Sequence, residues 1–101
     1  MPRMQRAVAM IRRDLQGHGA DVHEVAEQHR FRVVHTLYLD TGPLISALIV
    51  AGAVAEHDAA AVAVPSFEHA DLVRHAITEH AALATPLCLY PKGYRWPVVE
   101  L

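Results

Sequence analysis

The stretch Ala-Ala-Ala-Val-Ala-Val-Pro-Ser-Phe-Glu-His-Ala-Asp, residues 59–71, decides the fold. It starts as a run of small apolar residues, which ends at Pro65, and it continues through a short polar loop into a helical pattern. A short apolar run bounded by turn residues is typical of a strand buried on both faces. Ligands of open α/β sheets bind outside the carboxyl ends of such strands. We therefore expect a central strand here, with Ser66, Glu68 and His69 where a site would form.

The segments around this stretch alternate between strand and helix patterns. Further strand patterns cover residues 6–11, 31–39 and 83–90, and helix patterns cover residues 21–30, 43–57 and a segment that begins at residue 70 or 71. Strands that alternate with helices of this length indicate parallel strands joined by right-handed crossovers. The sequence thus predicts a single α/β domain over residues 1–101, with a mostly parallel four-stranded sheet.

The first two helices carry recognisable start signals. Asp21 with Glu24 forms a capping-box pattern, and the inner face of this helix would consist of Val22, Val25, Ala26 and His29. Before the second helix, the side chain of Asp40 or Thr41 could accept hydrogen bonds from early helical amides, and Pro43 suits the first turn.

The carboxyl-terminal half carries weaker signals. The third helix would turn one face inward, formed by Leu72, Val73, Ala76, Ile77 and His80. Pro86 lies inside the last strand pattern, and proline cannot donate to a sheet ladder, so this strand should be an edge strand or carry a bulge. Cys88 lies between two leucines, which indicates a buried strand position.

Helix 43–57 is apolar on nearly every side, whereas a helix with a solvent face should be polar there. It should therefore be covered by its own sheet and by something else, either the carboxyl-terminal tail or a second copy of the chain. We favour a second copy, with Leu44, Leu48 and Ala51 at the interface. Tyr94 and Trp96, in a tail of residues 91–101, are of the types that anchor interfaces, so this tail should dock on the core or on a partner.

Composition excludes several classes of protein. Hydrophobic residues make up 52% of the chain and charged residues 20%, as expected for a globular domain. The net charge of −2 gives no electrostatic case for a nucleic-acid partner. A single cysteine allows no intramolecular disulfide. No signal-peptide pattern is evident and the longest apolar run is too short to span a bilayer, so we expect a cytoplasmic protein.

The residue patterns give little support for catalysis or metal binding. Ser66, Glu68 and His69 share one loop, but no G-x-S-x-G turn surrounds the serine. The eight histidines are not at helical ligand spacing, and no H-E-x-x-H motif is present. We therefore expect no metal, no cofactor and no enzymatic activity.

Three motifs resemble the amino-terminal catalytic domain of serine recombinases, the resolvases and invertases. Residues 10–14, Met-Ile-Arg-Arg-Asp, occupy the place of the Tyr-x-Arg-x-Ser motif, Leu39-Asp40 matches a strand that ends near an aspartate, and residues 67–72 occupy the place of a Leu-Asp-Arg-Leu-x-Arg-like motif. The resemblance covers about residues 6–89. It implies a three-layer resolvase-like domain with strand order 2-1-3-4.

The departures from this family pattern bear on function. Asp14 stands at the position of the nucleophilic serine, Met10 at that of the tyrosine, and His69 and Leu72 at those of the two arginines. A carboxylate repels a phosphate, and the positive clamp that phosphoryl transfer needs is missing. We therefore expect no recombinase activity.

The leading hypothesis is a non-catalytic, resolvase-like protein that acts through protein association as a homodimer. The first alternative is a small-molecule or phosphate-binding domain, with a site at the carboxyl-end loops formed by Arg12, Arg13, Asp40, Ser66, Glu68 and His69. A third hypothesis, DNA binding without cleavage, is the least favoured because the chain is slightly acidic.

Overall fold

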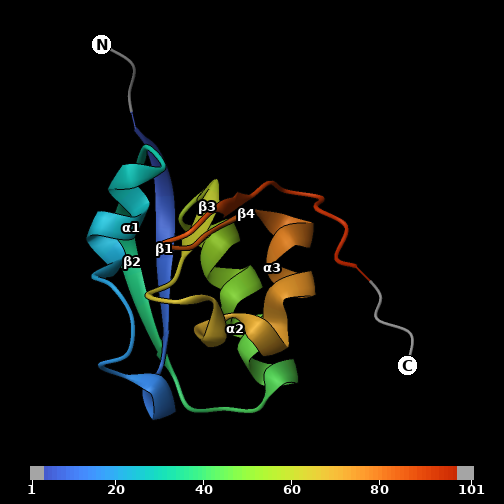
Figure 1. Cartoon of the computed structure of the whole chain (residues 1–101). Coiled ribbons are helices and arrows are strands. Elements are labelled where there is room, and N and C mark those ends of the chain that lie inside the picture. Colours follow the sequence, from blue (N-terminus) through green and yellow to red (C-terminus); the bar gives the residue numbers. More distant parts are fainter. Residues whose placement is uncertain (1–3, 98–101) are drawn as a thin grey trace.

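The computed structural model, described here for residues 4–97, contains one mixed five-stranded sheet (Figure 1). Its strands are β1 (Gln5–Arg12), β2 (Phe31–Leu39), β3 (Ala61–Ala63), β4 (Ala82–Ala84) and β5 (Leu89–Tyr90). The strand order is β2-β1-β3-β4-β5, with the first four strands parallel and β5 antiparallel to β4. The predicted α/β class, the mostly parallel sheet and the order of the first four strands are confirmed.

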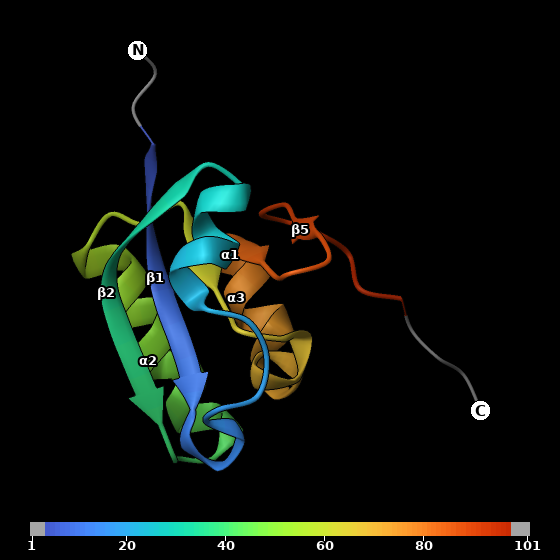
Figure 2. The same ribbon diagram turned by 60° about the vertical axis from the view of Figure 1, so that its left-hand side comes forward.

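The helices lie on both faces of this sheet. Helix α1 (Val22–Gln28) covers one face, and α2 (Pro43–Glu56) and α3 (Arg74–His80) cover the other (Figures 1 and 2). Three single 3₁₀ turns occur in the connections: Arg13–Leu15, Phe67–His69 and Asp71–Val73. Within the described residues, no helix is long and apolar enough to cross a membrane.

Side-chain size differs between the two faces of the sheet because side chains alternate along each strand. The face under α1 carries mostly small residues, and only Phe31 is large; they pack against Val25 and Ala26 of the helix: Ala7, Ala61, Ala63, Ala82 and Ala84. The face under α2 and α3 carries larger ones: Met10, Val62, Val64 and Leu83, packed against Val50, Val54 and Ile77. Every residue of β3 is fully buried, as expected for the central strand.

The start of α1 follows the sequence signals, whereas the start of α2 does not. The side chain of Asp21 accepts a hydrogen bond from the His23 amide at 2.7 Å. Gly42, not Asp40 or Thr41, is the N-cap of α2, and no side chain caps it. The predicted cap is wrong because the Thr41 hydroxyl instead pairs with the Ser46 hydroxyl at 2.8 Å.

The third helix differs most from its expected form. The chain from residue 67 to residue 73 makes two 3₁₀ turns, and the α-helix begins only at Arg74. Val73 and Ile77 are buried as expected, but Leu72 and His80 are exposed. A 3₁₀ turn has fewer residues per turn than an α-helix, so a face assigned at α-helical spacing does not hold across this segment.

Residues 83–90 form a tight hairpin and not one strand, so the expected four-stranded sheet has a fifth strand. Pro86 lies in the turn between β4 and β5, where it needs no ladder donor. The turn is closed by Thr85, whose amide and hydroxyl both donate to the Cys88 carbonyl. Cys88 is consequently half-buried in a turn, not buried in a strand as predicted.

Candidate functional site

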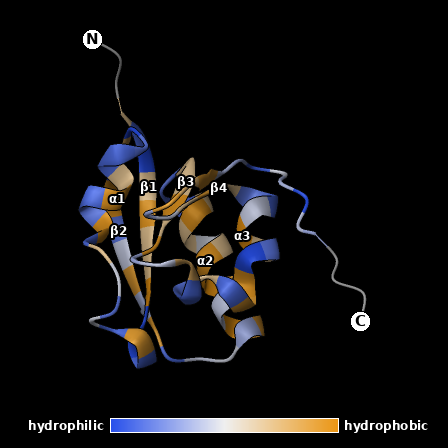
Figure 3. Ribbon diagram, in the orientation of Figure 1, coloured by the Kyte–Doolittle hydropathy of each residue, from blue (hydrophilic) through white to orange (hydrophobic). Residues whose placement is uncertain are grey.

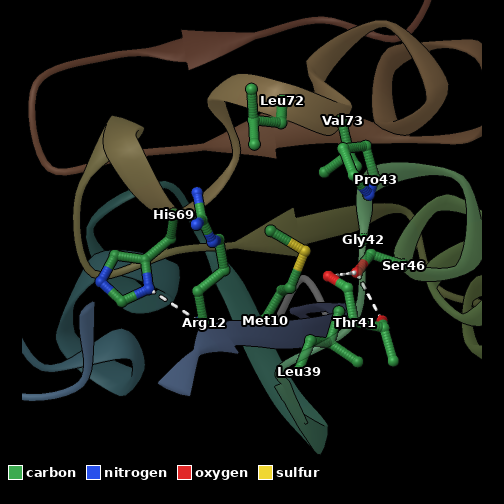
Figure 4. Close-up of a pocket in the computed structure, with 10 residues that line it drawn as sticks. All are labelled: Met10, Arg12, Leu39, Thr41, Gly42, Pro43, Ser46, His69, Leu72 and Val73. Atoms are coloured by element: carbon green, nitrogen blue, oxygen red, sulfur yellow. Dashed lines mark hydrogen bonds between the residues drawn. The ribbon is translucent and has the colours of Figure 1, made fainter. Parts of the chain in front are cut away.

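Three loops meet at the carboxyl edge of the sheet, the place where a site was expected. They follow β1, β2 and β3, and they surround a cavity of about 180 Å³ (Figure 4). The cavity wall is mostly apolar, and its polar side chains are two hydroxyls, one guanidinium and one imidazole. It is lined by Met10, Arg12, Leu39, Thr41, Gly42, Pro43, Ser46, His69, Leu72 and Val73. The edge is thus hollow, but the lining differs from the predicted set of polar residues.

His69 is a fully buried connector between loops. Its Nδ1 accepts a hydrogen bond from the Arg12 amide at 3.0 Å, which Figure 4 marks with a dashed line. Its Nε2 lies 3.2 Å from the carbonyl oxygen of His18, which can only accept. The ring is therefore neutral with the proton on Nε2, and neither nitrogen is left to take a proton from a substrate or to bind a phosphate.

Burial is the main cause that lowers the pKa of His69 below its ordinary value. Arg12 acts in the same direction, while the hydrogen bond to His18 and the carboxylates of Asp14 and Glu68 oppose it. Charging the ring would also destroy the hydrogen bond from the Arg12 amide, because both nitrogens of a charged imidazole are donors.

The protein should lose stability as the pH falls through about 6.5. Below that value the unfolded chain takes up a proton at residue 69 that the folded chain resists, so acid favours unfolding. We expect the drop in melting temperature between pH 7.5 and pH 5.5, at fixed protein concentration, to be smaller in His69→Gln than in the wild type. The exposed His23→Gln is the control. An unchanged pH dependence in His69→Gln would refute the assignment of a buried neutral ring.

Arg12 is the cation nearest to the cavity, and its charge is already paired. Its Nη2 lies 2.6 Å from Oδ2 of Asp14. The guanidinium points across the mouth of the cavity toward Leu72 (Figure 4). An anion would have to compete with Asp14 for this guanidinium, so the geometry gives only a weak anion site.

The other predicted ligand residues lie elsewhere. Arg13 extends over the ring of Tyr38, 5.8 Å from its centroid. Ser66 lines a separate hollow with Phe67 and Tyr90, and the side chains of Asp40 and Glu68 are exposed. Of the six predicted residues, the structure brings Arg12 and His69 together at the cavity. Sequence reasoning named Thr41 only as a possible helix cap and did not name Ser46, whose hydroxyl meets that of Thr41 at 2.8 Å.

The outer face of α2 is the second candidate site. Four large apolar side chains there, Leu44, Ile45, Leu48 and Ile49, are 37–74% exposed and are called the α2 surface below. Figure 3 shows this helix mostly in the hydrophobic colour, with paler bands between. Sequence reasoning named Leu44 and Leu48 but not the two isoleucines. Ala51, the third residue named, is half-buried.

The described part of the tail, residues 91–97, runs along α3 and leaves the α2 surface open (Figure 1). Trp96 docks on its own chain: its indole N–H donates to the Thr78 hydroxyl at 3.0 Å, and its ring packs against Tyr90 and Phe67. Tyr94 packs edge-on against Trp96 and stays partly exposed. The alternative that residues 91–97 cover α2 is therefore wrong, and residues 98–101 lie outside the described chain.

Over residues 4–97, no three histidine, cysteine or acidic side chains gather as they would around a metal ion. Comparisons of the chain with protein-family models, with curated proteins and with solved structures found no match.

Proposed function

We propose that this protein is a non-catalytic, resolvase-like α/β domain that acts through protein association, as a homodimer joined through the α2 surface. The observation that carries the proposal is the exposure of four adjacent leucines and isoleucines on one helix. Contiguous apolar patches of several hundred Å² are uncommon on monomers and mark interaction sites. The mass of the chain in solution as a function of concentration tests the proposal.

The size of the patch is consistent with a weak dimer. Complete burial of one such side chain contributes about 1.5–3 kcal/mol, and each is already partly buried. The eight side chains of two copies would together contribute roughly 10 kcal/mol. Association costs about 4–15 kcal/mol in lost freedom of motion. The α2 surface alone thus nearly balances this cost, and a stable dimer would use further contacts beside it.

The carboxyl-edge loops support a protein without catalytic chemistry. Both nitrogens of His69 bond to backbone groups, and Asp14 pairs with Arg12. A nucleophile, a free base and an unpaired cation are the groups that a recombinase-like reaction requires. At this edge, Arg12, Asp14 and His69 instead bond to one another or to backbone groups of the neighbouring loops.

A small-molecule site in the cavity is the second candidate, favoured by its position at the carboxyl edge. The cavity would suit a small apolar compound. It ranks below association because its hydroxyls also have partners: the Ser46 hydroxyl bonds to the hydroxyl and the carbonyl oxygen of Thr41.

A further inference from the structure

We infer that the cavity at the carboxyl edge of the sheet binds a small, neutral, apolar compound that carries one hydroxyl group, with phenol as the simplest probe. The inference rests on the second candidate function, the small-molecule site, and names the chemistry of its ligand. It is independent of the proposed dimer. The size of the cavity, its apolar wall and the hydrogen-bonding capacity of Ser46 carry it.

The cavity has the size of a small ring compound. A dry apolar cavity of about 150 Å³ can hold benzene, and the volume here is about 180 Å³. The buried part of its wall is apolar, because Met10, Leu39 and Val73 are at most 7% exposed. A buried water needs about two to four polar partners, which these three side chains do not offer. Over this part of the wall, an apolar ligand is therefore a better occupant than water.

The polar side chains lie on two sides of the cavity (Figure 4). Thr41 and Ser46 lie on one side, at the start of α2, and Arg12 and His69 lie on the other, after β1 and β3. The hydrogen bonds within each pair decide which chemical groups a ligand can add. The two sides are therefore considered in turn below.

The hydroxyls of Thr41 and Ser46 have no proton left to donate. The Ser46 hydroxyl donates to the Thr41 carbonyl oxygen at 3.1 Å. Its single proton is then used, so the Thr41 hydroxyl is the donor in the 2.8 Å contact between the two hydroxyls. A hydroxyl oxygen has two lone pairs, and one of those on Ser46 stays open. Because Ser46 lines the cavity and is 7% exposed, a hydrogen-bond donor on a ligand can fill it.

The polar groups on the opposite side do not favour an anion. Both ring nitrogens of His69 bond to backbone groups, and the Arg12 guanidinium pairs with Asp14. A carboxylate brings only acceptors, so it would meet the open lone pair of Ser46 and compete with Asp14 for Arg12. A neutral hydroxyl can donate to Ser46 and leaves the Arg12–Asp14 pair intact. The cavity therefore selects a neutral donor over an anion.

Met10 makes a phenol the suitable probe. Its side chain reaches into the middle of the lining residues in Figure 4 and is 1% exposed. A thioether adapts to irregular shapes and makes favourable contacts with aromatic rings. A ligand of about seven non-hydrogen atoms should bind with a dissociation constant on the order of 1 mM, so a titration should reach about 10 mM.

The methionine methyl signals in nuclear magnetic resonance spectra test where the ligand binds. We expect phenol to shift the Met10 methyl signal until the site is saturated and to leave that of Met4 unchanged. Met4 is 45% exposed and precedes the amino end of β1, so it reports contacts of phenol with the protein surface. Equal shifts of the two signals, or no shift of the Met10 signal in the folded protein, would overturn the site.

Ser46→Ala tests the chemistry of the ligand. Alanine is a strong helix former, and the change removes the oxygen that would accept from the ligand. Phenol should bind about fivefold more weakly, whereas toluene, with a methyl group in place of the hydroxyl, should bind the wild type and the variant equally. Ser66→Ala, outside the cavity, is the matched control and should not change phenol binding. Equal phenol binding by Ser46→Ala and the wild type would overturn the hydrogen bond to Ser46.

The choice of ligand and the proposed functions can fail separately. Tighter binding of benzoate than of phenol would overturn the neutral donor but keep the small-molecule site. A wild-type dimer that binds none of phenol, toluene and benzoate would overturn the small-molecule site and leave association through α2 intact. A monomeric chain that binds phenol at Met10 would overturn the dimer and support the ligand assignment.

Discussion

Replacement of Leu48 by glutamate should turn the protein into a monomer without unfolding it. Leu48 is 62% exposed at the middle of the α2 surface, so a charge there can be solvated in the single chain. In the proposed dimer, two carboxylates would be buried against each other and against leucines, which costs several kcal/mol. We expect the dissociation constant to rise at least a hundredfold, measured by sedimentation equilibrium.

Leu87→Glu provides the matched control. Leu87 is 95% exposed in the hairpin turn between β4 and β5, outside the α2 surface. The substitution is chemically identical and should leave the dimer intact. Equal weakening by both variants would indicate nonspecific association of exposed leucines, and an unaffected Leu48→Glu dimer would show that α2 is not the interface.

Gly19→Ala should cause the largest loss of stability among single-methyl changes. A Cβ at Gly19 would lie 2.3 Å from the carbonyl oxygen of Pro65, at the point where the loop after β1 crosses the loop after β3. The backbone at Gly19 also has φ +97°, which side-chain-bearing residues avoid. We expect a loss on the order of 3 kcal/mol, or roughly 15 °C in melting temperature.

Gly17→Ala separates the two causes of that loss. Gly17 has nearly the same φ, +94°, but nothing lies within 4 Å of a Cβ built on it. This variant should lose only about 1–2 kcal/mol through backbone strain. Equal losses in the two variants would mean that the loops do not meet as closely as described. Loss of the contact would also move Ala20, whose amide donates to the same Pro65 carbonyl at 2.8 Å.

The secondary structure of a segment was predictable from the sequence where a single physical rule determined it. Residues 61–63 were predicted to form a buried strand because a short run of small apolar residues bounded by turn residues is typical of a strand covered on both faces. The start of α1 followed from Asp21. The hairpin around Pro86 was missed because its turn is closed by Thr85 and the Cys88 carbonyl, a contact that no periodicity reveals.

The candidate site was less predictable because it depends on contacts between distant loops. Nothing in the order Ser66, Phe67, Glu68, His69 tells that the imidazole bonds to residues 12 and 18. The pairing of Arg12 with Asp14 is local and could have been anticipated from their spacing. The lack of a polar face on residues 43–57 did indicate an apolar surface on this helix. A helical pattern cannot show, however, whether the carboxyl-terminal tail covers that surface or packs elsewhere.

The mass of the wild-type protein over a dilution series tests the central claim most directly. Light scattering after size exclusion should give close to twice the chain mass of 11.1 kDa at high concentration, with a fall toward one chain mass on dilution. A mass of 11.1 kDa at every concentration, in a sample whose circular dichroism shows the folded α/β domain, would contradict association through the α2 surface.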